Sequence, residues 1–175
     1  LPPETCGCPD VMQLIPVTGY SGDILSGDSF VSGPGGAGML IFPAGKALLD
    51  HLKKERYMSI PGDQDSLTRL FREIGEDVLD VADTVRVSWQ EDTVVIRMDG
   101  YRLISGCRAM AAASPACCTM NPCPVCSLFS TCIVEGLGCG VRIERCTPGQ
   151  KKEAVEVQMT LLPGTTPDRL PDRQP

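Results

Sequence analysis

Two short β-rich segments separated by three polar residues constrain the fold of this chain more than any other feature. The segments are TVRVSW (residues 84–89) and TVVIRMD (residues 93–99), and Gln90, Glu91 and Asp92 lie between them. β-Branched and aromatic residues favour strands, and a linker this short joins antiparallel neighbours. We therefore expect an antiparallel β-hairpin here.

Helices are predicted before this hairpin. A helix is expected from Ala37 to about Glu55, with Pro43 tolerated in an early turn. The next helix has Asp65 or Ser66 as its candidate N-cap. Its apolar residues recur at helical spacing and share one face: Leu67, Leu70, Phe71, Ile74, Val78 and Leu79.

A cysteine-rich linker follows the hairpin, and a helix over 126–137 and strands over 139–146 and 153–162 close the chain. This order predicts an α+β fold in which helices pack on an antiparallel sheet, with a cysteine-rich closing segment. We expect an irregular N-terminal arm (1–35), one domain (36–162) and a disordered, proline-rich tail (163–175).

Charge and composition exclude several classes of function. The net charge of -6 argues against a nucleic-acid partner, which needs clustered basic residues. We find no apolar run near the roughly 20 residues that span a bilayer, so no membrane span is expected. With His51 as the only histidine, the chain has no Ser–His–Asp set, HExxH motif or nucleotide fingerprint, and no catalytic residue is predicted.

The cysteines are the main candidates for chemistry, because six of the ten lie between residues 117 and 139. Cys118, Cys123 and Cys126 have the spacing of the first three ligands of plant-type two-iron ferredoxins. Thiolates suit zinc and iron–sulfur clusters, and either is a candidate cofactor. The candidate metal ligands are Cys118, Cys123, Cys126, Cys132, Cys139 and Cys146.

Two other interpretations of the cysteines stay open. The CxxC pair Cys123 and Cys126 is typical of redox-active dithiols. Alternatively, the cysteines form disulfides or are inert buried thiols. Disulfides need an oxidising compartment or a hyperthermophilic host, and the sequence gives no sign of either. We expect a cytoplasmic protein. Cys107 is predicted to lie in the core or a pocket wall, whereas Cys6 and Cys8 either complete a site or are exposed loop thiols.

Three segments together resemble the 4-vinyl reductase domain family, which is related to TRAPP-complex subunits and haem nitric-oxide sensors. They are GAGMLIFPAGKALLDHLKKE, LFREIGEDVLDVADTVRVSWQEDTVVIRMDG and CPVCSLFSTCIVEGLGCGVRIERCTPGQKKEAVEVQM, and the resemblance covers roughly residues 36 to 160. It implies a domain that binds small hydrophobic molecules, with a zinc ion held by cysteines and a glutamate. Cys123 or Cys126 and Cys146 match that ligand set, but Ile143 stands in place of the glutamate and Ala154 in place of a later cysteine.

Three functions are therefore considered. The first is a sensory or regulatory module that binds a small hydrophobic ligand beside a cysteine-ligated metal. The second is an iron–sulfur reductase or electron carrier acting on a vinyl or tetrapyrrole compound. The third is a scaffold subunit that forms a homodimer through its first two helices. Candidate pocket residues for the first are Met39, Phe42, Phe71, Met98, Met110 and Phe129.

Overall fold

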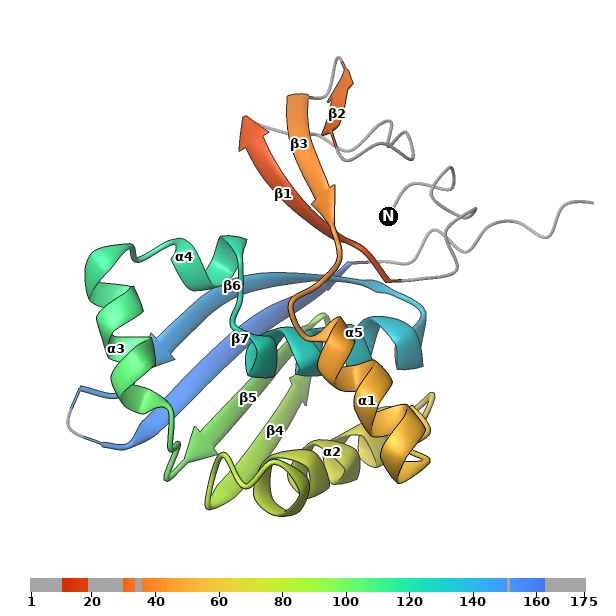
Figure 1. The fold of residues 1–175 in the computed structure, drawn as a ribbon, viewed down its shortest axis with the longest axis vertical. Coiled ribbons are helices and arrows are strands. Elements are labelled where there is room, and N and C mark those ends of the chain that lie inside the picture. Colours follow the sequence, from red (N-terminus) through yellow and green to blue (C-terminus); the bar gives the residue numbers. More distant parts are fainter. Residues whose placement is uncertain (1–10, 19–29, 34–35, 151, 163–175) are drawn as a thin grey trace, which may run out of the picture.

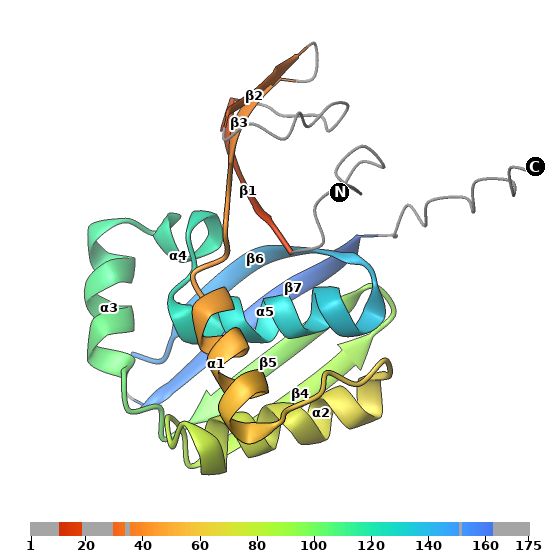
Figure 2. The same ribbon diagram turned by 45° about the vertical axis from the view of Figure 1, so that its right-hand side comes forward.

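A four-stranded antiparallel sheet is the framework of the protein. The structure, a computed structural model, describes residues 11–18, 30–33, 36–150 and 152–162. The strands lie in the order β4 (Thr84–Gln90), β5 (Thr93–Asp99), β7 (Ala154–Leu162) and β6 (Gly140–Pro148). The helices α1 (Lys46–Arg56), α2 (Gln64–Arg72) and α5 (Pro124–Leu137) cover one face of this sheet (Figures 1 and 2). The expected α+β fold is confirmed.

The expected hairpin is formed by β4 and β5. Gln90 pairs with Thr93, and Glu91 in the turn has a positive φ of 44°. Along β5, Val94, Ile96 and Met98 are fully buried, while the residues between them lie on the opposite face. Such alternation is required of a sheet that has helices on one face. β7 pairs with β5 and supplies Val155, Val157 and Met159 to the same core.

The helix predicted before the hairpin is present, but its first turn lies earlier in the chain than expected. Asp63, rather than Asp65 or Ser66, is the N-cap, and its carboxylate accepts a hydrogen bond of 2.8 Å from the Ser66 backbone N–H. After Arg72 the helix continues as a π-helical turn over Glu73–Val78. Phe71 packs against Phe129 of α5 with ring centroids 5.0 Å apart.

α5 is the most buried helix and lies between α1 and the sheet. It starts with Pro124 in its first turn, where the missing N–H costs nothing, and ends at Gly138, whose φ is 63°. The turn before α1 packs directly on it: the Gly45 backbone N–H donates a buried hydrogen bond of 2.9 Å to Ser127 Oγ. A Cβ at Gly45 would lie 2.2 Å from the Leu128 backbone nitrogen, so only glycine fits.

The segment Cys117–Leu137 is apolar and long enough to cross a membrane by length and composition, with a hydropathy of 1.3. We had expected no such run. Half of its most apolar 18-residue stretch is buried inside the protein, and the segment is divided into α4 (Cys117–Met120) and α5 by Asn121, Pro122 and Cys123. Buried core helices of soluble proteins can be equally long and equally apolar.

The structure differs from the sequence-based expectation at the N-terminus. Part of the arm expected to be irregular forms strands β1 (Gln13–Thr18) and β2 (Phe30–Gly33), which flank β3 (Gly36–Ile41) in a separate antiparallel sheet. This sheet projects away from the helices in both views (Figures 1 and 2). The helix expected from Ala37 therefore begins only at Lys46, because the preceding residues pair as a strand.

The cysteine-rich linker also contains structure that was not expected. Residues Ile104–Ala113 form α3, and α4 follows it. Both lie near the edge strand β6 (Figure 1). The segment 163–175, predicted to be disordered, lies outside the described residues, as do Cys6 and Cys8.

We predict that Gly45→Ala destabilises the fold by about 2 kcal/mol or more, because the added methyl group has to push the backbone of α5 away. Gly106→Ala is the matched control. Gly106 is an exposed helical glycine with no atom within 4 Å of an added Cβ, so alanine should stabilise by up to about 1 kcal/mol. Urea unfolding of both variants measures the difference, and equal midpoints would contradict this packing.

Candidate functional site

Five cysteines from four elements meet beside the edge strand β6, and we call them the thiol cluster. Cys107 lies on α3, Cys118 on α4, Cys123 and Cys126 at the start of α5, and Cys146 on β6. All three helices contact β6 (Figure 2). Cys107 and Cys126 are buried, and the other three are half-buried. All five are free thiols.

A β-bulge brings Cys146 to this place. Successive residues of a strand point to opposite faces, so Cys146 and Ile143, three positions apart, would normally face opposite ways. The register of β6 on β7 shifts between Ile143 and Arg145, which leaves Glu144 as an extra residue. As a result, Ile143 and Cys146 both pack against the hydrophobic core, and Glu144 is exposed.

The start of α5 stabilises a negative charge on Cys123. This residue is the N-cap, with extended φ and ψ of -61° and 162°. The Cys126 thiol and the backbone N–H groups of Cys126 and Val125 interact with its sulfur, although none of them makes a cap hydrogen bond of normal geometry. Together these interactions lower the pKa of Cys123 to about 6.

The other thiols continue from Cys123 as a series of neighbours. Cys126 interacts with both Cys123 and Cys146, and these contacts, together with burial, raise its pKa well above the usual value. The contact with Cys126 lowers the pKa of Cys146, which also interacts with Cys118. Burial raises the pKa of Cys118 to about 12 and that of Cys107 to about 11. Cys126 and Cys118, whose pKa values are raised, therefore alternate with Cys123 and Cys146, whose pKa values are lowered.

Tyr101 is a polar neighbour of the cluster that the sequence did not suggest. Its side chain is fully buried directly after β5, and its backbone N–H donates to the Glu153 carbonyl at 2.8 Å. The hydroxyl lies beside the Cys123 sulfur but outside normal hydrogen-bond geometry, and it has no other partner among the described residues. Burial raises the pKa of this phenol, so it is a proton donor without an acceptor.

The structure brings four of the six predicted metal ligands together, namely Cys118, Cys123, Cys126 and Cys146. Cys132 and Cys139 lie elsewhere. Cys132 is six residues beyond Cys126, or about 9 Å further along the helix, and is fully buried near Glu135 and Lys53. Cys139 lies beyond the opposite end of α5.

Side-chain interactions between the thiols run pairwise, from Cys123 to Cys126, from Cys126 to Cys146 and from Cys146 to Cys118. Among the described residues, no three His, Cys, Asp or Glu side chains are placed so that they could hold a metal ion. The arrangement of the thiol cluster therefore does not fit a zinc or iron–sulfur site without movement of its side chains.

The six predicted pocket residues do not gather around one cavity. Phe71, Met98 and Phe129 are fully buried in the core. Phe42 and Met110 are exposed large apolar residues. Met39 lies on β3, in the N-terminal sheet.

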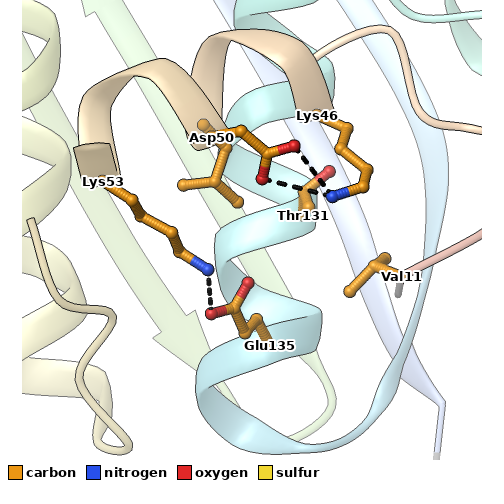
Figure 3. Close-up of a pocket in the computed structure, with 7 residues that line it drawn as sticks. Val11, Lys46, Asp50, Lys53, Thr131 and Glu135 are labelled. Carbon is orange, nitrogen blue, oxygen red and sulfur yellow. Dashed lines mark hydrogen bonds and ion pairs between the residues drawn. The ribbon is translucent and has the colours of Figure 1, made fainter. Parts of the chain in front are cut away.

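An open pocket of about 230 Å³ does lie between α1 and α5 (Figure 3), but its chemistry is polar. Lys46 contacts Asp50 at 2.9 Å, and Lys53 contacts Glu135 across the two helices. Within each ion pair the two opposite charges neutralise each other. A second pocket, beside the β6–β7 turn, contains Arg97, Lys152 and Glu156. Neither is lined by the predicted apolar residues.

We predict that Cys123 is alkylated fastest of the described cysteines near neutral pH. Because its pKa is lowered to about 6, about nine tenths of it is thiolate at pH 7. The rate of reaction with iodoacetamide, measured from pH 5 to 9 with a chelator present, should reach half its maximum near pH 6. Cys123→Ser should lose this fast phase and Cys139→Ser should keep it, whereas a midpoint near pH 9 would contradict the geometry of the α5 N-terminus.

Comparison with known proteins adds no relative. No family model, curated protein or solved structure matches the chain. The resemblance to the 4-vinyl reductase family therefore stays a prediction.

Proposed function

We propose that this chain is a sensory or regulatory domain that reacts with disulfides through Cys123 and Cys126. The observation that carries the proposal is the arrangement of the CxxC pair at the start of α5. Cys123 is the half-buried N-cap of a 14-residue helix, and Cys126, one turn later, is only 2% exposed. The two thiols interact directly.

This asymmetry is what thiol–disulfide exchange requires. The attacking group has to be a thiolate that solvent-borne disulfides can reach. Cys123 meets both requirements, because it is partly accessible and its pKa is lowered to about 6. The second cysteine has to be shielded from solvent but adjacent to the first, and Cys126 is both. Protonated until it reacts, Cys126 stabilises the Cys123 thiolate and then resolves the mixed disulfide.

The surroundings of the pair support the same chemistry. The Tyr101 hydroxyl beside Cys123 has no hydrogen-bond partner among the described residues, and a thiolate at Cys123 is an acceptor for it. Leaving a buried hydroxyl unpaired costs about 1–3 kcal/mol. Tyr101 therefore favours the charged form of Cys123.

A cysteine-ligated metal is the second candidate, and one observation favours it. Cys118, Cys123, Cys126 and Cys146 come from three separate elements and still form a continuous set of contacts. Four thiolates are a common donor set for zinc and for iron–sulfur clusters. Their side chains would have to turn from pairwise contacts toward a common centre, because no three are so placed.

Disulfide exchange at Cys123 and Cys126 requires neither the small hydrophobic ligand nor the homodimer that were considered from the sequence. The first two helices were expected to offer a dimer face, and their apolar residues Leu49, Leu52 and Leu67 are buried in the domain core. The predicted aromatic pocket residues Phe71 and Phe129 pack against each other there. The proposed function therefore depends on the thiols of Cys123 and Cys126.

We predict that the reduced 175-residue chain, treated anaerobically with oxidised glutathione and a chelator, forms a disulfide between Cys123 and Cys126. Peptide mass mapping after acid quenching identifies the bond. Cys126→Ser should accumulate a stable mixed disulfide of glutathione with Cys123, because the resolving thiol is missing. Cys139→Ser is the control and should behave like the unmodified chain.

The result that would overturn the proposal is a chain whose Cys123 and Cys126 stay reduced while other cysteines react. The same preparation, before chelation, should be assayed for zinc, iron and acid-labile sulfide. About one zinc, or a visible band with iron and sulfide, lost from Cys118→Ser and Cys146→Ser alike, would establish the metal site instead.

A further inference from the structure

The thiol cluster contains a second pair of cysteines that the CxxC chemistry does not use. Cys118 on α4 interacts with Cys146 on β6. Cys146 in turn interacts with Cys126, the buried member of the CxxC pair. Pairwise interactions thus connect the four thiols in the order Cys123, Cys126, Cys146, Cys118, on β6 and on the helices α5 and α4 that both contact it. Cys123 is at the N-terminus of α5, and Cys118 is on the short helix α4, which lies beside the edge strand β6.

We propose that Cys118 and Cys146 form a second dithiol, which receives the disulfide made at Cys123 and Cys126 and so returns the CxxC pair to its reduced form. This inference rests on the proposed exchange activity and extends it to a relay. The order of contacts allows each step to occur between sulfurs that already interact, with Cys126 as the junction.

The first two steps load the CxxC pair. The Cys123 thiolate attacks one sulfur of a low-molecular-weight disulfide, forming a mixed disulfide and expelling one thiolate, which takes up a proton. Cys126 then attacks the Cys123 sulfur and expels the second thiol. Two electrons have passed from the protein dithiol to the external disulfide, which is now two thiols.

The next two steps move the bond inward without further electron transfer. Cys146 attacks the Cys126 sulfur, so that a Cys126–Cys146 bond forms and Cys123 leaves as a thiolate. Cys118 then attacks Cys146, a Cys118–Cys146 bond forms, and Cys126 leaves. The protons of Cys118 and Cys146 end on Cys123 and Cys126. The CxxC pair is free to react with a second external disulfide.

The geometry of the second pair gives this relay a structural consequence. Cys146 lies just after the β-bulge at Glu144, and no backbone hydrogen bond among the described residues joins α4 to β6. A Cys118–Cys146 bond would tie α4 to the sheet edge covalently. The protein would therefore hold two disulfides and differ from its reduced state at one defined surface, which is the property of a redox-responsive regulator.

The test is a time course of the reduced 175-residue chain with a chelator and excess oxidised glutathione, followed by intact mass and disulfide mapping. The Cys123–Cys126 bond should appear first and the Cys118–Cys146 bond second, until four thiols are lost from this set. The rate of the internal transfer should not depend on glutathione concentration, because that transfer is intramolecular. Cys118→Ser should stop with one disulfide, whereas Cys117→Ser, altered at the neighbouring position on α4, should reach two.

Cys123→Ser decides whether the second bond depends on the first. The relay requires the Cys118–Cys146 bond to form roughly tenfold more slowly, or not at all, in this variant. An unchanged rate would show direct oxidation of the second pair and overturn the relay. If the variant does not fold, the unmodified chain provides the same test. There, a Cys118–Cys146 bond that forms at a rate dependent on the glutathione concentration would show direct oxidation and overturn the relay. A Cys123–Cys126 bond with no later transfer would overturn the relay alone, and no Cys123–Cys126 bond would overturn the proposed function itself.

Discussion

The burial of α5 is the constraint on which the rest of the structure depends. Its side chains Leu128, Phe129 and Ile133 are fully buried, and the helix is held between the sheet and α1. Gly45 permits the closest approach of α1, and its N–H satisfies the buried Ser127 hydroxyl. A helix fixed on two sides has a fixed N-terminus. That terminus carries the CxxC pair, so the packing of the core determines where the reactive sulfurs lie.

A second constraint comes from the strict alternation of a β-strand. Cys146 can face the helices together with Ile143 only because the bulge at Glu144 changes the parity of β6. Without the extra residue, either the thiol or the isoleucine would face away from the core. The bulge therefore couples packing and chemistry in one strand, as bulges at the edges of sheets often do.

The periodicity of apolar residues predicted the helices and strands that are buried on one face. It failed for elements that are determined by strand pairing or that have few buried residues. The hairpin of β4 and β5, the helices α2 and α5 and the closing strands were expected from spacing alone. β3 was expected to be a helix, because its apolar residues suit either structure and only pairing with β1 selects the strand. α3 has few residues that are buried and a weak apolar face, so its sequence gave little signal.

The same distinction holds for the site. The spacing of Cys118, Cys123 and Cys126 was informative because these residues lie on either side of the turn that joins α4 to α5. Cys132 lies further along α5 and Cys139 beyond its far end, and sequence spacing alone does not show this separation. Tyr101 joins the cluster through long-range packing, for which a single sequence carries no pattern. A buried aromatic residue directly after a core strand was the only available hint.

Cys126 shows how closely stability and reactivity are joined in this protein. As a buried side chain it packs in the core like a small apolar residue, and as a thiol it contacts both Cys123 and Cys146. Serine at this position would leave a polar group among apolar neighbours, while alanine would leave a small cavity. The two substitutions remove the same chemistry but disturb the core in different ways. An effect that both share therefore belongs to the thiol, and an effect that only one shows belongs to the packing.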